Sequence, residues 1–168
     1  MEAGELSFHP KSEALRRRML NRPMFWLFQW KTLPLAGCAG LRLASLDESA
    51  CTVTLPGGFR TQNPFRSTYF AAQAMAAEMS TGAPAMVLVA GAPASVAMLV
   101  TGFRASYRKK VVGESFYTFE EVAGLRAAVE RAAGGPEPQA FVARSTARDA
   151  RAEVCSDFEV TWSFKRRA

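Results

Sequence analysis

Residues 61–82, TQNPFRSTYFAAQAMAAEMSTG, combine one carboxylate with side-chain amides in a segment rich in alanine. Asn63 precedes a proline, Gln73 lies among the alanines, and Glu78 is the only acid of the segment. A carboxylate can act as a general base toward water, and an amide can orient water or a carbonyl group. Alanine neighbours would desolvate Glu78 and raise its pKa toward the range that base catalysis requires.

The same three side chains also have ordinary structural interpretations. Glu78 could reach solvent or pair with an arginine, because acids are rarely buried. Asn63, or Ser67 after it, could cap the helix N-terminus, with Pro64 at the first helical position. Gln73 could be a satisfied amide on the helix face. From the residues alone, the catalytic and structural interpretations both stay open.

Several kinds of catalytic site are not expected from the motifs of this chain. The sequence contains no G-x-S-x-G, P-loop, G-x-G-x-x-G or C-x-x-C pattern. The only histidine, His9, falls in a leader near the N-terminus, so Ser-His or Cys-His catalysis and a histidine metal site are not expected. We therefore predict no metal and no cofactor, and any acid-base chemistry must use carboxylates, amides, hydroxyls or water.

The bulk composition is that of a globular domain. A chain of 168 residues favours one domain, and 49% apolar with 21% charged residues argues against disorder. Cys38, Cys51 and Cys155 have no metal-ligand spacing, and one of them stays unpaired in any disulfide scheme. A reducing environment fits best, so we predict a cytoplasmic location.

The net charge of +6 comes partly from basic runs at residues 16–18, 108–110 and 165–167. Such runs are usually a solvated face, and binding of anionic phosphates is the alternative. None of them alternates with aromatic residues as a single-strand nucleic-acid groove would, so no nucleic-acid partner is expected. Residues 79–103 carry no charge, but Pro84, Pro93 and three glycines interrupt them, and no membrane span is expected.

Two helical segments are predicted near the N-terminus. Residues 11–20 contain good helix formers, and Pro23 restarts a second helix over residues 24–33. Three aromatic residues of this second segment, Trp26, Phe28 and Trp30, could cover a sheet end, line a ligand channel or lie in a subunit contact. Plain core packing is favoured over these three alternatives, although no sequence feature separates them.

The rest of the chain reads as strands around the alanine-rich helix. Strands are expected at residues 40–47, 51–56, 95–103, 113–120, 139–147 and 154–164, with an amphipathic helix from Val122 to Ala133 and an apolar element of uncertain type at 84–91. The strand at 95–103 is apolar on both faces, so both faces should be covered. One helix wrapped by an antiparallel sheet is an α+β layout, and a second molecule is expected on the outer face.

Residues 63–82, which follow a two-strand hairpin and lead into a long sheet, resemble the central helix of the hotdog fold. They are similar to acyl-CoA thioesterases of the phenylacetate-pathway type, and closer still to an uncharacterised thioesterase-like branch. The resemblance implies an antiparallel sheet wrapped around one long central helix. It divides the chain into an N-terminal helical extension, 1–32, and a hotdog domain, 33–168.

The resemblance also implies a dimer with two acyl-thioester sites at its interface. Asn63 matches the family's asparagine, residues 70–72 (Phe-Ala-Ala) match its His-Gly-Gly, and Glu78 matches its acid, allowing for one residue of slippage. That acid acts as general base or nucleophile, while amides at the helix start polarise the carbonyl oxygen. The Phe-Ala-Ala sequence adds side chains where the family's glycines let the carbonyl approach closely.

The sequence thus predicts a thioesterase acting on acyl-CoA or acyl carrier protein, working as a homodimer or tetramer, with coenzyme A present only as part of the substrate. The alternative is a non-catalytic acyl-thioester or fatty-acyl binding protein of the same fold. Glu78, Asn63 and Gln73 are the predicted catalytic residues. The predicted substrate-binding residues are Ser67, Thr68, Phe70, Ala71, Arg104, Lys109 and Lys110, the last three for the coenzyme A phosphates unless they are a solvated strand end.

Overall fold

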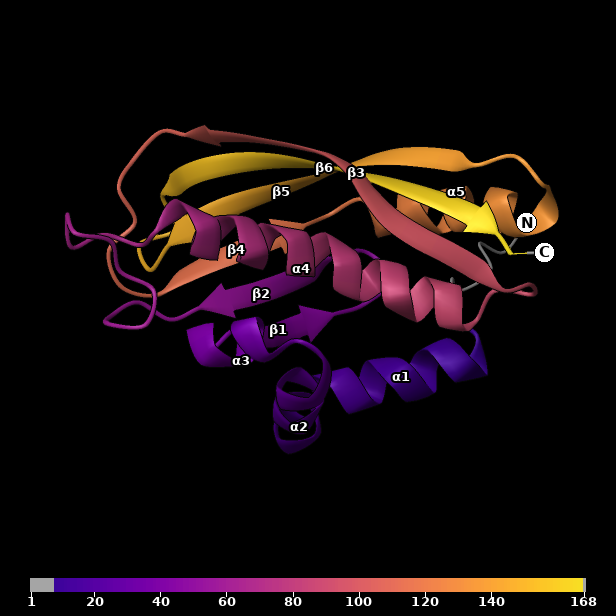
Figure 1. Cartoon of the computed structure of the whole chain (residues 1–168), viewed down its shortest axis with the longest axis horizontal. Coiled ribbons are helices and arrows are strands. Elements are labelled where there is room, and N and C mark those ends of the chain that lie inside the picture. The colour runs from indigo at the N-terminus through magenta and orange to yellow at the C-terminus, as the bar shows by residue number, and fades with distance from the viewer. Residues whose placement is uncertain (1–7, 168) are drawn as a thin grey trace, which may run out of the picture.

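A six-stranded antiparallel sheet curves around one long helix in the computed structural model, which describes residues 8–167 (Figure 1). The strands are β1 (Arg42–Leu46), β2 (Cys51–Leu55), β3 (Val96–Tyr107), β4 (Ser115–Phe119), β5 (Gln139–Asp149) and β6 (Val154–Arg166), in the order β1-β2-β4-β5-β6-β3. The helices are α1 (Pro10–Leu20), α2 (Arg22–Thr32), α3 (Pro34–Ala39), α4 (Phe70–Ala90) and α5 (Val122–Gly134). The predicted α+β layout is confirmed, while residues 1–7 of the predicted extension lie outside the described part.

Helix α4 is the centre of the fold because its side chains are small. Ala76 and Ala77 are completely buried, and alanines allow the sheet to approach the helix backbone closely. Two polar contacts join the helix to the sheet. Ser80 Oγ lies 2.8 Å from Ser145 Oγ on β5, and Trp162 Nε1 on β6 donates to Thr81 Oγ1 at 2.9 Å. Each buried polar group of these two pairs therefore has a partner.

The predicted boundaries of this helix are wrong at both ends. It begins at Phe70 with Tyr69 as the N-cap, and no side chain caps it, so neither Asn63 nor Ser67 is the N-cap and Pro64 is not helical. The helix then continues through Pro84 to Ala90 and absorbs the apolar element of uncertain type. Proline removes one helical hydrogen bond, and burial of the second half of the helix offsets that loss. No helix of the described residues is long and apolar enough to cross a membrane.

The predicted strands are present, and their alternation sets the core. On β6, Phe158, Val160 and Phe164 face inward and are at most 1% exposed, as the pattern predicts. Strand β3 lies at the edge of the sheet and pairs only with β6 within residues 8–167. Leu99, opposite Ser163, is 66% exposed on its outer face. The bulge between Val100 and Gly102 turns Phe103 to the inner face, opposite Val160, where its ring packs against Phe158 and is still 44% exposed. A single chain therefore leaves apolar side chains of β3 uncovered, but Phe103 does not share the face of Leu99 as the plain alternation predicts.

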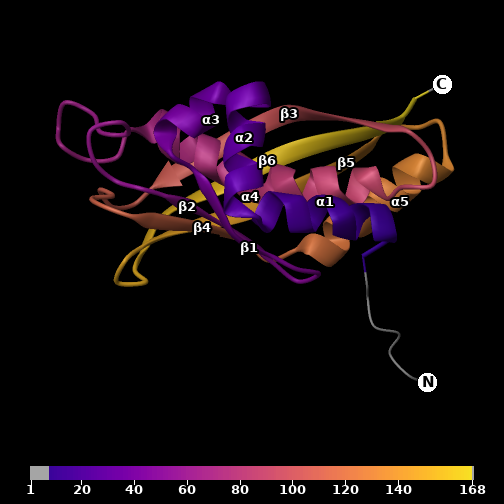
Figure 2. The ribbon, with the colours of Figure 1, turned by 90° about the horizontal axis from the view of Figure 1, so that it is seen from below.

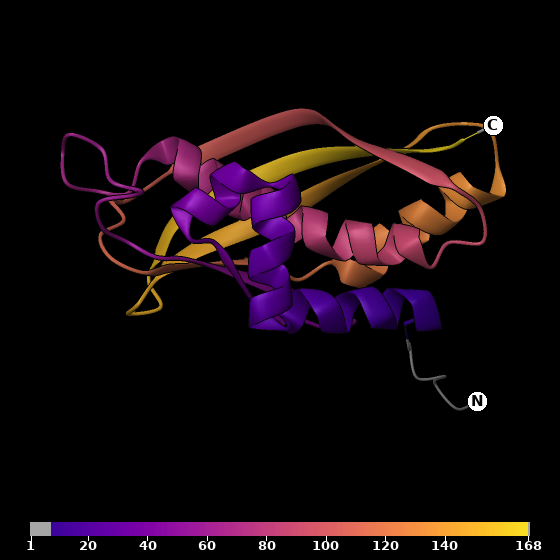
Figure 3. The same cartoon turned by 60° about the horizontal axis from the view of Figure 1, so that its bottom comes forward.

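The N-terminal helices are part of the same core. Helix α1 contacts α4, and Figure 3 shows α2 turning away from the end of α1 toward the middle of α4. Seen from below in Figure 2, α1 lies alongside the second half of α4. Met19 of α1 and Phe25 of α2 are each 5% exposed and belong to the central hydrophobic cluster. His9 is fixed at the start of α1, where its Nδ1 accepts a hydrogen bond from the Lys11 amide at 3.3 Å.

Helix α5 fills the space beside the far half of α4, although the resembled family lacks it in its usual core. Val122, Leu125, Ala128 and Ala132 of this helix are completely buried against the sheet and α4. The insertion between β4 and β5 is therefore a structural part of the domain.

We predict that Leu125→Ala lowers the free energy of unfolding by about 2–5 kcal/mol, because it leaves a cavity in a packed core. The matched control is Leu35→Ala on α3, where the leucine is 72% exposed. That variant should change the free energy by less than about 0.5 kcal/mol. Urea unfolding followed by circular dichroism measures both, and equal effects would contradict a structural role for α5.

Candidate functional site

Asn63 organises the loop that precedes α4. Its Oδ1 accepts hydrogen bonds from the amides of Phe65 and Ser67, at 3.0 and 3.2 Å, and from Ser67 Oγ at 3.2 Å. The backbone N–H of Asn63 donates to the Ser67 carbonyl at 2.8 Å. This bond closes a compact turn in which Arg66 has a φ of 57°. No acceptor among the described residues takes the Asn63 side-chain NH2 group, so its two N–H bonds are available to a ligand.

The first turn of α4 offers two free backbone donors. The backbone N–H groups of Thr68 and Tyr69 donate to the carbonyls of Val111 and Thr61, respectively. The backbone N–H groups of Phe70 and Ala71 have no acceptor among the described residues. Unpaired N–H groups and the helix dipole favour a negatively charged oxygen at this position.

Aromatic side chains surround this helix start. The Phe70 ring is 56% exposed and packs edge-on against Tyr69 and Tyr107. Thr68 Oγ1 is buried and has no hydrogen-bond partner in the described structure. Of the predicted substrate-binding residues, Ser67, Thr68, Phe70 and Ala71 therefore lie together at the start of α4.

Glu78 lies in the middle of α4, half-buried and without a hydrogen bond or ion pair from any described residue. Burial raises the pKa of its carboxyl group above the ordinary value for glutamate. The carboxylate rests against Gly82, where an added Cβ would lie 2.9 Å from Glu78 Oε1 and 3.1 Å from Trp162 Cζ2. A side chain one turn beyond the acid would therefore shift the carboxylate or press on the Trp162 ring.

Glu78 borders a cavity of about 110 Å³ whose other walls are apolar. The walls come from α1, α2, α4, β3 and β6, and they include Met19, Phe25, Phe28, Met98 and Trp162. Apolar walls solvate the ionised carboxylate less well than water does, and no counter-charge among the described residues compensates, so burial raises the pKa of Glu78. The arrangement suits a base that receives a proton from a bound water molecule.

Gln73 is fully engaged within the fold. Its Nε2 donates to the Thr68 carbonyl at 3.2 Å, and its Oε1 accepts from Ser156 Oγ at 3.0 Å. It is 5% exposed and ties the helix start to β6. The geometry favours positioning of the helix start, and a direct catalytic role of Gln73 stays a prediction.

The base and the free amides are well separated along the same helix. Glu78 follows Phe70 by eight residues, which corresponds to about 12 Å along the axis of a helix. A thioester carbonyl needs its donors within about 3 Å of the oxygen while the base holds the attacking water. Glu78 and the amides of one chain are therefore too far apart to act on the same carbonyl group.

The three basic residues predicted to bind phosphates do not form one cluster. Lys109 Nζ is bonded to Asp149 at 2.8 Å and to Glu153, and its pKa is raised by these two carboxylates. Arg104 lies 4.0 Å from Glu159 on the neighbouring strand. Lys110 Nζ lies 6.0 Å from the centre of the Phe65 ring, close to the loop of Asn63. Of the three, Lys110 is nearest in structure to the helix start, and the phosphate-binding role stays a prediction.

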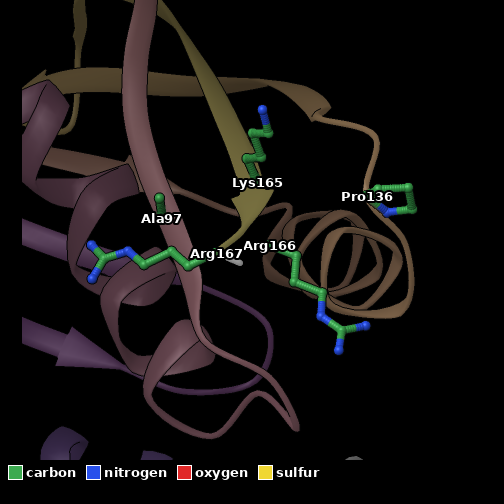
Figure 4. A pocket seen from close by; sticks show the side chains of 5 residues that line it. All are labelled: Ala97, Pro136, Lys165, Arg166 and Arg167. Atoms are coloured by element: carbon green, nitrogen blue, oxygen red, sulfur yellow. The ribbon is translucent and has the colours of Figure 1, made fainter.

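Other basic residues line hollows on the surface. Figure 4 shows a wide pocket of about 780 Å³ at the end of β6, where the side chains of Lys165, Arg166 and Arg167 point in different directions. Diverging cations of this kind do not hold a single anion, which fits a solvated face.

A smaller pocket of about 250 Å³ contains arginines that sequence reasoning missed. Its lining includes Arg22, Arg42 and Arg60, which come from α2, β1 and the loop before α4. No local sequence pattern could have grouped these three residues, because the fold alone brings them together. Within residues 8–167, no three His, Cys, Asp or Glu side chains gather where they could hold a metal ion.

The position of the N-terminal helices over Glu78 was also not foreseen. Phe28 lines the cavity, in agreement with one of the three alternatives left open for the aromatic residues of α2. Trp26 and Trp30 stay on the surface, with 59% and 44% exposure. The only advance signal was the density of aromatic residues after Pro23.

Comparison with known proteins places the chain in a family and a fold. The family model described as Domain of unknown function (DUF4442) matches residues 22–163. No curated protein matches the sequence.

Similar solved structures share the fold at low sequence identity. A Pseudomonas aeruginosa protein of unknown function, described as a probable thioesterase, is 16% identical, with a TM-score of 0.72 over 95% of this chain and 99% of its own. A protein with unknown function from Chlorobaculum tepidum is 13% identical, with a TM-score of 0.73 over 93% and 94% of the two chains. A Haemophilus influenzae thioesterase is 15% identical, with a TM-score of 0.62 over 83% and 88%. The predicted hotdog fold is confirmed.

The raised pKa of Glu78 predicts a stability effect with a definite sign. Ionisation of a carboxyl group whose folded pKa is raised destabilises the native state as the pH rises from the unfolded pKa to the folded pKa. Glu78→Gln should therefore raise the melting temperature at pH 8, and the gain should disappear near pH 4. The control is Glu130→Gln, an exposed acid on α5 that should show no such pH-dependent gain. A gain of equal size at both pH values would contradict the burial of an ionised Glu78.

Proposed function

The chain belongs to the DUF4442 family, and we propose that it hydrolyses acyl thioesters of coenzyme A or acyl carrier protein. The observation that carries this proposal is Glu78, which borders an apolar cavity without any charged or hydrogen-bonding partner among the described residues. The thioesterase descriptions of two proteins of the same fold agree with it. Our proposal keeps the phenylacetate-pathway type of thioesterase, because residues 63–82 resemble the helix motif of those enzymes.

The proposed reaction uses Glu78 as the general base. Its carboxylate takes a proton from a bound water molecule, whose oxygen attacks the thioester carbonyl carbon. The oxyanion that forms is stabilised by the free amides of Phe70 and Ala71 and by the Asn63 NH2 group. The C–S bond then breaks, the thiolate takes the proton from Glu78, and the products are a carboxylic acid and a free thiol.

A complete site in this proposal requires two chains. Because about 12 Å of helix separates Glu78 from the amides of its own chain, the donors must come from the helix start of a second copy. The exposed edge of β3 supports such pairing, since an unpaired edge strand that displays exposed apolar side chains, here Leu99 and Phe103, is normally covered by another chain. We propose a homodimer joined along this edge. Tetramer formation and a cytoplasmic location remain predictions.

The binding-only alternative depends on whether Phe70 and Ala71 close the oxyanion site. The outward, half-exposed position of the Phe70 ring and the unpaired amides beneath it favour hydrolysis. Alanine at the two glycine positions adds only a methyl group each, so the backbone donors stay within reach of a small carbonyl group.

We predict that Glu78→Gln lowers kcat for acyl-CoA hydrolysis by about 10²–10⁴-fold, the usual contribution of a general base. A panel of acyl-CoA esters with detection of the released thiol measures this, and circular dichroism checks that the variant folds. Glu130→Gln serves as the matched control and should keep full activity. Full activity of the Glu78→Gln protein would contradict the proposal, and binding of acyl-CoA without any turnover by wild type would favour the binding-only alternative.

We predict that Leu99→Glu, at the exposed outer face of β3, converts the dimer to a monomer and abolishes hydrolysis. A buried, unpaired carboxylate at the proposed interface is strongly unfavourable. Light scattering coupled to size-exclusion chromatography gives the mass, with Val112→Glu as a control at another exposed apolar residue, 69% exposed and outside β3. An unchanged mass with Leu99→Glu would place the interface elsewhere.

A further inference from the structure

We propose that the N-terminal helices close the acyl-chain pocket of this site, and that Phe25 and Phe28 of α2 set the length of acyl chain it accepts. The inference rests on the proposed function, because it assigns the cavity beside Glu78 to the substrate's acyl group. It adds a specificity determinant contributed by a segment outside the sheet and central helix.

The cavity has a polar end and an apolar body. Glu78 is the only charged residue that lines it, and Gly82 and Met86 follow along α4 at intervals of four residues, on the same side of the helix. Gly82 leaves space directly after the acid, and the remaining walls are hydrophobic. A thioester group beside Glu78 would thus direct its acyl tail along α4 toward Met86.

The opposite wall of the cavity belongs to the N-terminal helices. Met19, Phe25 and Phe28 lie across from α4, and the Phe25 and Phe28 rings stack with their centres 6.1 Å apart. The same three residues also line a second apolar hollow of about 290 Å³ between α1 and α2, which is bordered by Arg18 and Lys31. The two rings and Met19 therefore form the partition between the cavity at Glu78 and the hollow behind it.

The size of the cavity sets the expected substrate. A volume of about 110 Å³ is small beside the roughly 300–1,000 Å³ of pockets that hold drug-sized ligands. We therefore expect the wild-type protein to prefer short acyl groups such as butyryl. Methionines from α1, α4 and β3 line the cavity, and their flexible thioethers adapt to small differences in shape. Chains longer than this would have to pass the partition into the hollow behind it.

The test is the chain-length profile of kcat/KM, from acetyl-CoA to palmitoyl-CoA, for wild type and variants of α2. Phe28 is half-buried, so Phe28→Ala should fold, open the partition and raise kcat/KM for decanoyl-CoA at least about tenfold relative to butyryl-CoA. Phe25→Leu, which trims the more deeply buried ring, should shift the profile in the same direction. Trp26→Ala is the matched control, because Trp26 is exposed on the same helix and does not line the cavity; its profile should equal that of wild type.

A binding measurement separates this inference from the proposed hydrolysis. Calorimetry with non-hydrolysable S-alkyl-CoA thioethers of increasing length should show the same shift to longer chains for Phe28→Ala. If the thioethers show that shift and no ester is hydrolysed, the pocket stands and the proposed reaction is wrong. If hydrolysis depends on Glu78 but Phe28→Ala and Phe25→Leu keep the wild-type profile, the N-terminal helices do not set chain length and the inference is overturned.

Discussion

Glu78 is withdrawn from water without a counter-charge, and the surrounding packing must hold it there against the cost of desolvation. Helix α4 makes this possible because its small side chains let the sheet, α1 and α5 approach from several sides. Gly82 provides the space for the carboxylate, and the bond from Trp162 to Thr81 fixes the indole ring that forms one wall. A larger side chain at position 82 would displace either the acid or the tryptophan.

The same helix separates the two functions that thioester hydrolysis needs. Its start presents free amides and the loop of Asn63, while its middle presents the base, and the rise of an α-helix keeps them about 12 Å apart. A second copy resolves this separation if the start of its helix reaches Glu78. The exposed apolar face of β3 is where the single chain is incomplete, so assembly and catalysis depend on the same edge of the sheet.

Much of the fold could be predicted because alternation along strands is a local signal. The inward residues of β6 and the amphipathic face of α5 follow directly from their spacing. The start of α4 could not be predicted, because the Asn63 oxygen bonds the turn of residues 63–67 and leaves the helix to begin later. The end of α4 was not predicted correctly because a proline such as Pro84 usually interrupts a helix. In this helix, burial of the second half offsets the backbone hydrogen bond that the proline removes.

Within the candidate site, the sequence identified Glu78 and the helix start but not their surroundings. Lys109 was predicted to bind phosphate, yet it is bonded to Asp149, forty residues away in the chain, a pairing that only the fold creates. Likewise, nothing in the alternation of α2 shows that Phe25 and Phe28 cover the acid while Trp26 faces outward. Contacts between distant segments decide these points, and local patterns do not record them.

The most direct measurement of the central claim, that Glu78 acts with the helix start of a second chain, is subunit mixing. Glu78→Gln removes the base, and Ala71→Pro removes one amide donor in the first helical turn, where proline is tolerated. Each variant alone should be inactive. Equal mixing should restore about a quarter of wild-type activity, because half of the dimers are mixed and each mixed dimer has one intact site. Mixed dimers that form and stay inactive would contradict the claim.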